Sequence, residues 1–192
     1  MAKQFLSIEP HIQKFIKKQH VFFVGSAAVN SRVNVSPKGL DAFRVLDANR
    51  VVYLDRTGSG SEAAAHLIAD GRMTIMFCAF EGPPLILRLY GKGVSHLKGS
   101  IGFDAIFESH YTGDVPLGTR QIVEIAVDLV QASCGYGVPT FEYAGERTTL
   151  DEWTERKGID GLLDYWAEKN LKSIDGLPTG FEPLLESETK RR

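Results

Sequence analysis

The stretch that decides the fold runs from Phe43 to Leu54 and reads Phe-Arg-Val-Leu-Asp-Ala-Asn-Arg-Val-Val-Tyr-Leu. Two runs of β-forming residues flank the tetrapeptide from Asp47 to Arg50, whose composition is typical of a hairpin turn. The pattern predicts two antiparallel strands, Phe43 to Leu46 and Val51 to Leu54. Strands that pair as a hairpin do not open a parallel βαβ series.

Further β-forming runs lie on both sides of this hairpin, and a short helix over 62–69 interrupts them. We expect strands over residues 21–24, 32–36, 73–80, 85–90 and 122–130. The tripeptide Pro-Lys-Gly at 37–39 is expected to end the second of these strands. Strands joined by hairpin turns favour a mainly β fold, a six-stranded antiparallel barrel, over a parallel sheet.

Helical patterns occupy both ends of the chain. Ile8, Ile12 and Ile16 recur at helical spacing near the N-terminus, and helical segments resume after Thr148. We expect a barrel domain with its N-terminal helix over 1–147, and a C-terminal helical extension over 148–192 packed on the same domain. The last dozen residues are expected to be frayed and solvated.

The composition excludes several classes of function. The chain has 192 residues, and its 22 basic and 24 acidic side chains nearly cancel, so it lacks the positive surface of a nucleic-acid-binding protein. Neither a signal peptide nor a membrane-spanning run is found, which favours a cytoplasmic protein without membrane contact. Cys78 and Cys134 are expected to be buried, reduced thiols. The five histidines lack metal-ligand spacing, so no metal site is expected.

Residues Gly58 to Ala63 fit the pattern G-x-G-x-x-A, the dinucleotide fingerprint of a Rossmann fold. The hairpin before this motif and the absence of alternating helices and strands after it argue against that fold. What remains is a Gly/Ser loop that enters a helix, where free backbone N–H groups suit a phosphate monoester. The structural alternative is a helix N-cap in which Ser59 or Ser61 bonds only its own helix.

Several ordered motifs together carry a resemblance to a known family. They are Arg32-Val-Asn-Val-Ser-Pro-Lys-Gly39, Phe43-Arg-Val-Leu-Asp47, Val52-Tyr-Leu-Asp-Arg-Thr-Gly-Ser-Gly-Ser-Glu62, Phe77-Cys-Ala-Phe-Glu-Gly-Pro-Pro84, Arg88-Leu-Tyr-Gly91 and Ser133-Cys-Gly-Tyr-Gly-Val-Pro139. From about residue 21 to 139 the chain resembles the pyridoxamine 5′-phosphate oxidase-like proteins, in the branch of flavin-nucleotide-binding members. The resemblance implies an FMN-binding split barrel that works as a homodimer.

The resemblance also implies a set of phosphate-binding residues. Arg44 occupies the position of a basic strand residue that holds the FMN phosphate, and Lys38 lies close by in the sequence. The oxidase loop T-N-x-G-S-R-K corresponds to Asp55-Arg-Thr-Gly-Ser-Gly-Ser61, in which Ser59 matches. Gly60 and Ser61 replace the Arg-Lys pair, so the phosphate loses two cationic partners.

The same resemblance implies contacts to the flavin ring. Asn34 and Ser36, on the strand that leads to Lys38, are expected to supply polar groups to its pyrimidine edge. Ser133 and Cys134 correspond to the region with which the second subunit reaches the flavin.

The resulting functional hypothesis is an FMN-dependent oxidoreductase that acts on a small molecule by hydride transfer at the flavin. Oxidation of pyridoxamine phosphate itself is not expected, because the segment from Phe181 to Leu185 lacks the R-L-x-P element of those enzymes. Two alternatives stay open on the same scaffold: a non-catalytic flavin- or haem-binding protein, and a deazaflavin-dependent reductase. The sequence does not name the substrate or the electron donor.

Overall fold

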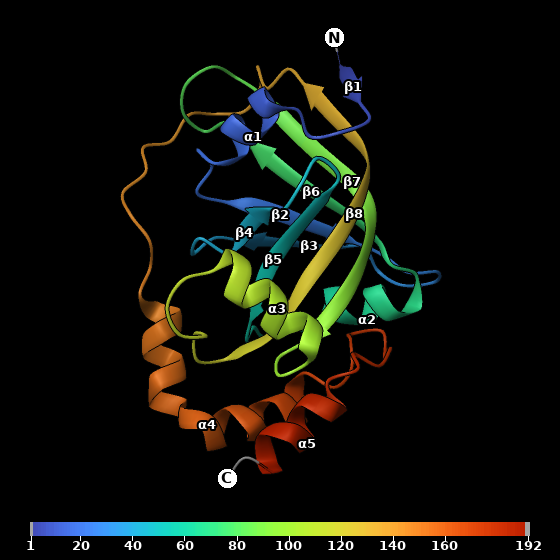
Figure 1. Cartoon of the computed structure of the whole chain (residues 1–192), viewed down its shortest axis with the longest axis vertical. Coiled ribbons are helices and arrows are strands. Elements are labelled where there is room, and N and C mark those ends of the chain that lie inside the picture. Colours follow the sequence, from blue (N-terminus) through green and yellow to red (C-terminus); the bar gives the residue numbers. More distant parts are fainter. Residues whose placement is uncertain (1, 191–192) are drawn as a thin grey trace.

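The computed structural model describes residues 2–190, and one antiparallel sheet dominates it (Figure 1). The strands are β1 (Lys3–Phe5), β2 (Phe22–Ser26), β3 (Asn34–Lys38), β4 (Phe43–Val45), β5 (Arg50–Arg56), β6 (Arg72–Cys78), β7 (Ile86–Leu97) and β8 (Thr119–Ser133). The helices are α1 (Pro10–Ile16), α2 (Glu62–Ala69), α3 (Ile101–His110), α4 (Thr149–Lys169) and α5 (Glu182–Lys190).

Seven strands follow one another in the order β3-β2-β6-β7-β8-β5-β4, and β1 adds an eighth strand by pairing with β8. The expected antiparallel barrel with flanking helices is confirmed, although the count of six strands was too low. The hairpin is confirmed as well, because β4 and β5 pair with Phe43 opposite Tyr53.

The sheet curls so that its two edges approach each other. Phe22 of β2, Phe43 of β4 and Phe77 of β6 meet inside the curl, with ring centroids 5.0 Å apart for Phe22 and Phe43 and 5.1 Å for Phe43 and Phe77. Around them lies the main hydrophobic core, to which β2, β5, β6, β7 and β8 all contribute. Burial of these side chains gives the curled sheet most of its stability.

Most strands extend beyond the predicted limits at one end or both, and two of these extensions have a specific cause. β3 continues through Pro37, which the sequence pattern took as a strand end; as an edge strand it tolerates a residue without an N–H. β7 passes Gly91, where its register with β8 shifts between Tyr90 and Gly91. A Cβ at Gly91 would overlap the carbonyl oxygen of Ala126, so only glycine lets the two backbones approach there.

The C-terminal helices form a second core against α2. Leu162 and Trp166 of α4 and Leu184 of α5 are buried together with Ala64 of α2. Gly158, at φ 61°, separates two helical halves of α4. The prediction of a frayed tail was wrong for residues 182–190, because α5 buries Leu184; residues 191 and 192 lie outside the described part.

Residues 134–148 join β8 to α4 without helix or strand, and we call this segment the strap. It arcs away from the barrel on the left of Figure 1. Cys134 at its start is exposed, which corrects the expectation of a buried thiol, whereas Cys78 is buried and burial raises the pKa of its thiol. Within residues 2–190, no helix has the length and apolar character to cross a bilayer.

Candidate functional site

A buried ion network lies where β5 delivers the loop that leads into α2. The carboxylate of Asp55 accepts hydrogen bonds from Lys38 Nζ at 2.7 Å, from Arg120 Nη2 at 2.9 Å and from Gln121 Nε2 at 3.1 Å. Asp55 and Arg120 are both almost fully buried, whereas Lys38 keeps about a quarter of its side chain exposed (24%). Lys38 is therefore the member of the network that a ligand reaches.

The geometry explains why Asp55 stays ionised. Burial would raise the pKa of its carboxyl group, but the positive charges of Arg120 and Lys38 and the hydrogen bonds from Lys38 and Gln121 outweigh burial and hold that pKa well below its usual value. The neighbouring Tyr53 hydroxyl has the opposite fate, because burial and the negative charge of Asp55 raise its pKa.

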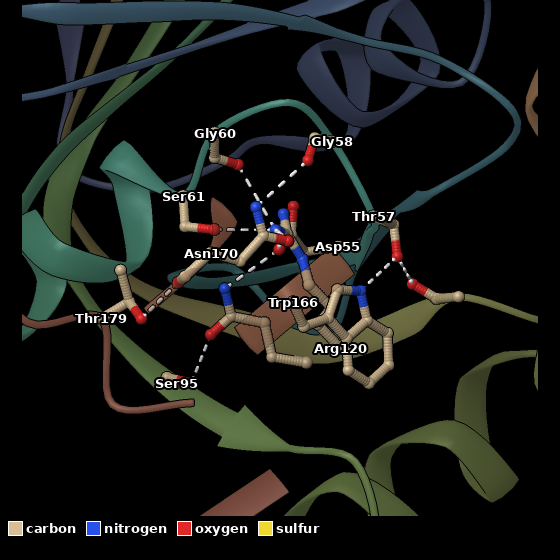
Figure 2. Close-up of polar contacts among 12 residues, drawn as sticks. Asp55, Thr57, Gly58, Gly60, Ser61, Ser95, Arg120, Trp166, Asn170 and Thr179 are labelled. Carbon is tan, nitrogen blue, oxygen red and sulfur yellow. Dashed lines mark hydrogen bonds and ion pairs between the residues drawn. The ribbon is translucent and has the colours of Figure 1, made fainter. Parts of the chain in front are cut away.

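The loop from Thr57 to Ser61 is held by β8. Arg120 Nη1 donates to Ser61 Oγ at 2.8 Å and to the carbonyl oxygen of Gly60 at 3.3 Å (Figure 2). Ser61 precedes α2 but its side chain does not bond back to the helix, so the alternative of a simple N-cap does not hold for Ser61. Ser59 and Gly60 are exposed and face solvent.

The C-terminal extension holds the same loop from another side. Asn170 accepts from Arg120 Nη1 at 2.9 Å and donates to the carbonyl oxygen of Gly58 at 3.3 Å (Figure 2). Trp166 Nε1 donates to Thr57 Oγ1 at 2.8 Å. The loop is therefore a rigid junction of β5, β8 and α4, which is how a preorganised binding loop is built.

A second polar chain runs along β3 and β2. Ser36 Oγ donates to Asn34 Oδ1 at 3.1 Å, Asn34 Nδ2 donates to Ser26 Oγ at 3.3 Å, and Ser26 Oγ bonds His66 Nδ1 at 3.0 Å. Asn34, Ser36 and Lys38 alternate along β3, so their side chains lie on one face of the strand. The row of polar groups expected beside Lys38 is thus present.

The structure brings together seven of the ten residues that the sequence suggested. They lie on β3, at the end of β5 and on the loop that follows it: Asn34, Ser36, Lys38, Asp55, Ser59, Gly60 and Ser61. Three others lie elsewhere within one chain. Arg44 faces α3, where it bonds Asp41 and the carbonyl oxygen of His110, and Ser133 and Cys134 lie at the far end of β8.

Arg44 lies apart from the loop within one chain because side chains alternate along a strand. Phe43 points into the core, so its neighbour Arg44 must point out of it. The guanidinium lies 4.6 Å from the centre of the Tyr111 ring. Within one chain, Arg44 is therefore not a partner of the loop.

Sequence reasoning missed Arg120, Gln121, Trp166 and Asn170. Arg120 follows a Gly/Pro-containing stretch and was assigned to a loop, but β8 already begins at Thr119. One feature of the sequence indicated that Trp166 and Asn170 could reach the site: both lie in the helical extension that was expected to pack on the barrel.

A cavity of about 1420 Å³ lies between the strap and the barrel. Its wall includes the aromatic residues Phe15, Phe80, Phe141, Tyr143 and Trp153 and the cations Lys14, Lys18, Lys38 and Arg147. Tyr143 of the strap stacks on His20 with ring centroids 3.5 Å apart. Lys38 borders both this cavity and the ion network, so it connects the two.

A sheet curled in this way, with helices at its ends and a polar loop entering α2, defines the split-barrel class of proteins. Residues 8–134 match the family model for pyridoxamine 5′-phosphate oxidase. The chain is also 34% identical over 197 residues to the pyridoxamine 5′-phosphate oxidase family protein ustO of Aspergillus flavus, across 90% of this chain and 75% of that protein. The chain therefore belongs to the pyridoxamine 5′-phosphate oxidase family.

Solved structures share the fold at low sequence identity. A variant of HupZ from Group A Streptococcus aligns with a TM-score of 0.52 and 18% identity, over 66% of this chain and 99% of HupZ. A pyridoxamine 5′-phosphate oxidase-like protein of Lactobacillus delbrueckii aligns with a TM-score of 0.51 and 14% identity, over 66% of this chain and 94% of that protein. At these identities the likeness concerns the fold alone.

Proposed function

We propose that this protein binds FMN and acts as an oxidoreductase on a small molecule, with two chains forming each flavin site. Family membership supports a flavin-related function. The observation that carries the proposal is the loop from Gly58 to Ser61, which enters α2 on the buried guanidinium of Arg120, whose partner Asp55 also binds the partly exposed side chain of Lys38.

The residues present fit a phosphate group. Ser59 and Gly60 are exposed at the entry to α2, where backbone N–H groups and the helix dipole favour an anion. Within residues 2–190, the buried side-chain atoms without a hydrogen-bond partner are Tyr53 Oη, Arg56 Nε, His66 Nε2 and Arg120 Nε. Of these, Arg120 Nε belongs to the ion network, and an unpartnered buried donor in a native structure calls for an explanation such as a bound ion.

The chemistry divides between cofactor and protein. When bound, FMN supplies the group that accepts or donates hydride. Lys38 and the loop would hold its phosphate, and Asn34 and Ser36 would orient the polar edge of the ring. Asn34 Nδ2 donates to Ser26 Oγ, which His66 Nδ1 holds in turn, so the rotamer of Asn34 is fixed and the protein's part is positioning.

A homodimer accounts for the residues that lie apart in one chain. Ser133 and Cys134 lie at the end of β8 that is far from Asp55. The strap beside them exposes Tyr136 and Phe141, by 84% and 60%. Large exposed aromatic side chains in one segment favour contact with another protein surface, and a second copy would bring Ser133 and Cys134 to its partner's loop.

An absorbance spectrum during titration with FMN tests the proposal. We expect flavin bands that shift on binding, and an affinity that falls when Lys38 is replaced by methionine. Turnover of NAD(P)H by the loaded protein then separates a reductase from a non-catalytic binder. A protein that ignores FMN but gains the spectrum of bound haem would contradict the proposal.

A further inference from the structure

Two cations share one carboxylate next to the phosphate loop, and one of them, Arg120, bonds the loop itself. Lys38 and Arg120 both bond Asp55, so together the three residues carry a single positive charge. Glu62, in the first turn of α2, adds another carboxylate beside the loop, where its Oε1 accepts from the backbone N–H of Ile174 at 2.9 Å. A phosphate dianion at this loop therefore meets almost no net positive charge.

Arg120 reaches the loop from β8 rather than from the loop itself. Its Nη1 bonds Ser61 and Gly60, the two positions at which the oxidase motif carries Arg and Lys. One buried cation thus lies under the two positions that lost their charges. Its other terminal nitrogen, Nη2, is committed to Asp55 at 2.9 Å, so Asp55 decides how much of that charge a ligand at the loop experiences.

We propose that Asp55 determines the specificity of the site for the phosphorylated over the unphosphorylated flavin. Because its carboxylate neutralises one of the two cations, the site prefers FMN to riboflavin only weakly. This inference rests on the proposed flavin binding and concerns the phosphate end of the ligand alone. FMN and riboflavin differ only in the phosphate, so the ratio of their dissociation constants isolates that contribution.

The test is a charge series in which both flavins are titrated against each variant. Asp55→Asn adds one positive charge to the network, Lys38→Gln removes one, and Asp55→Asn with Lys38→Gln restores the charge of the parent. We expect the parent to prefer FMN by less than about tenfold. The preference should rise about tenfold in Asp55→Asn, since a charge-assisted bond to phosphate is of that order. It should fall in Lys38→Gln and return to the parent value in the double variant.

Asp128→Asn is the matched control. Asp128 lies exposed on the same strand as Arg120, so its replacement changes the total charge equally without touching the network. Its FMN-to-riboflavin ratio should equal that of the parent. A rise in this control as large as that in Asp55→Asn would overturn the inference, because the effect would then come from overall charge.

Asp55→Asn leaves two buried or partly buried cations without their counterion, so it is the variant most prone to unfold. If it does, adding Asp55→Asn to the Lys38→Gln background gives the same comparison in a network of lower charge, and the ratio must again rise about tenfold. Equal ratios in these two proteins would overturn the inference while flavin binding stands. A parent that binds neither flavin would overturn the proposed function and this inference together.

Discussion

Arg120 and Asn170 bond each other at 2.9 Å beneath the loop, and neither side chain is accessible to solvent to any useful extent. This contact links the start of β8 to the end of α4. Through Asn170 Nδ2 and the carbonyl oxygen of Gly58, it also fixes the loop that we propose holds the phosphate.

Replacement of Asn170 by leucine should therefore destabilise the fold. The buried Arg120 loses an acceptor, which costs about 1–3 kcal/mol, and the exposed Gly58 loses the donor that anchors it. Urea unfolding monitored by circular dichroism measures the change. Glu155→Gln, on an exposed part of α4, is the control and should stay within about 0.5 kcal/mol of the parent. An equal effect of the two substitutions would contradict this account.

The stability of the protein should depend on Asp55 in acid. Its pKa is lowered in the folded state by Arg120 and Lys38, so the folded chain keeps this carboxylate ionised while the unfolded chain takes up a proton near pH ~3.9. As the pH falls below about 4, the unfolded state binds more protons and the free energy of unfolding drops. Asp55→Asn should be less stable than the parent at pH 7, by about 3–5 kcal/mol. Its free energy of unfolding should also fall less than that of the parent between pH 6 and pH 3. Unfolding curves across this pH range check the sign; a variant with the same acid slope as the parent would exclude Asp55 as the cause.

Gly91→Ala should be among the most damaging small substitutions in the sheet. The new methyl group would overlap the carbonyl oxygen of Ala126 at the bulge between β7 and β8, and neither backbone has room to move. We expect a loss of about 2–3 kcal/mol, as for overpacked cores. Gly137→Ala, in the strap with no atom near its added methyl group, serves as the control for thermal unfolding. A similar melting temperature for both variants would contradict the observed bulge.

Arg44→Met separates the family-based assignment from the observed geometry. Arg44 bonds Asp41 and stacks on Tyr111 on the α3 side of the sheet. The variant should therefore be less stable by about 1 kcal/mol, while its affinity for FMN should equal that of the parent. Lys38→Met, measured in the same FMN titration, should lose affinity. If Arg44→Met loses as much affinity as Lys38→Met, Arg44 serves the flavin site of a partner chain.

Local patterns predicted the parts of the fold whose causes are local. The hairpin from Phe43 to Leu54 was predicted from its turn residues and the β-forming runs beside them, and it is confirmed. The helix predicted over 62–69 is confirmed as well. β1 was missed because three residues carry too little pattern, and its pairing with β8 depends on a distant strand. α5 was missed because most of its residues are polar, although Leu184 is buried against α4 and α2.

The candidate site was predicted in part for a related reason. Lys38, Asp55 and the loop were found because they lie close in sequence and follow a family motif. Arg120 and Asn170 were not found, since their role comes only from partners 50 or more positions away. From the sequence alone, Arg120 is expected to be exposed, because only the folded chain brings it to the buried carboxylate of Asp55.

The bonds from the C-terminal extension to the loop can form only late in the synthesis of the chain. Thr57, Gly58 and Glu62 each bond a residue 109 to 112 positions later in the chain. At translation rates of about 5–20 residues per second, the ribosome needs roughly 5–20 s to make that intervening length. The barrel strands emerge first, and during this interval Arg120 of β8 and the carbonyl oxygen of Gly118 already hold the loop. A nascent chain that stalls before residue 166 therefore carries the loop without the later bonds from Trp166, Asn170 and Ile174.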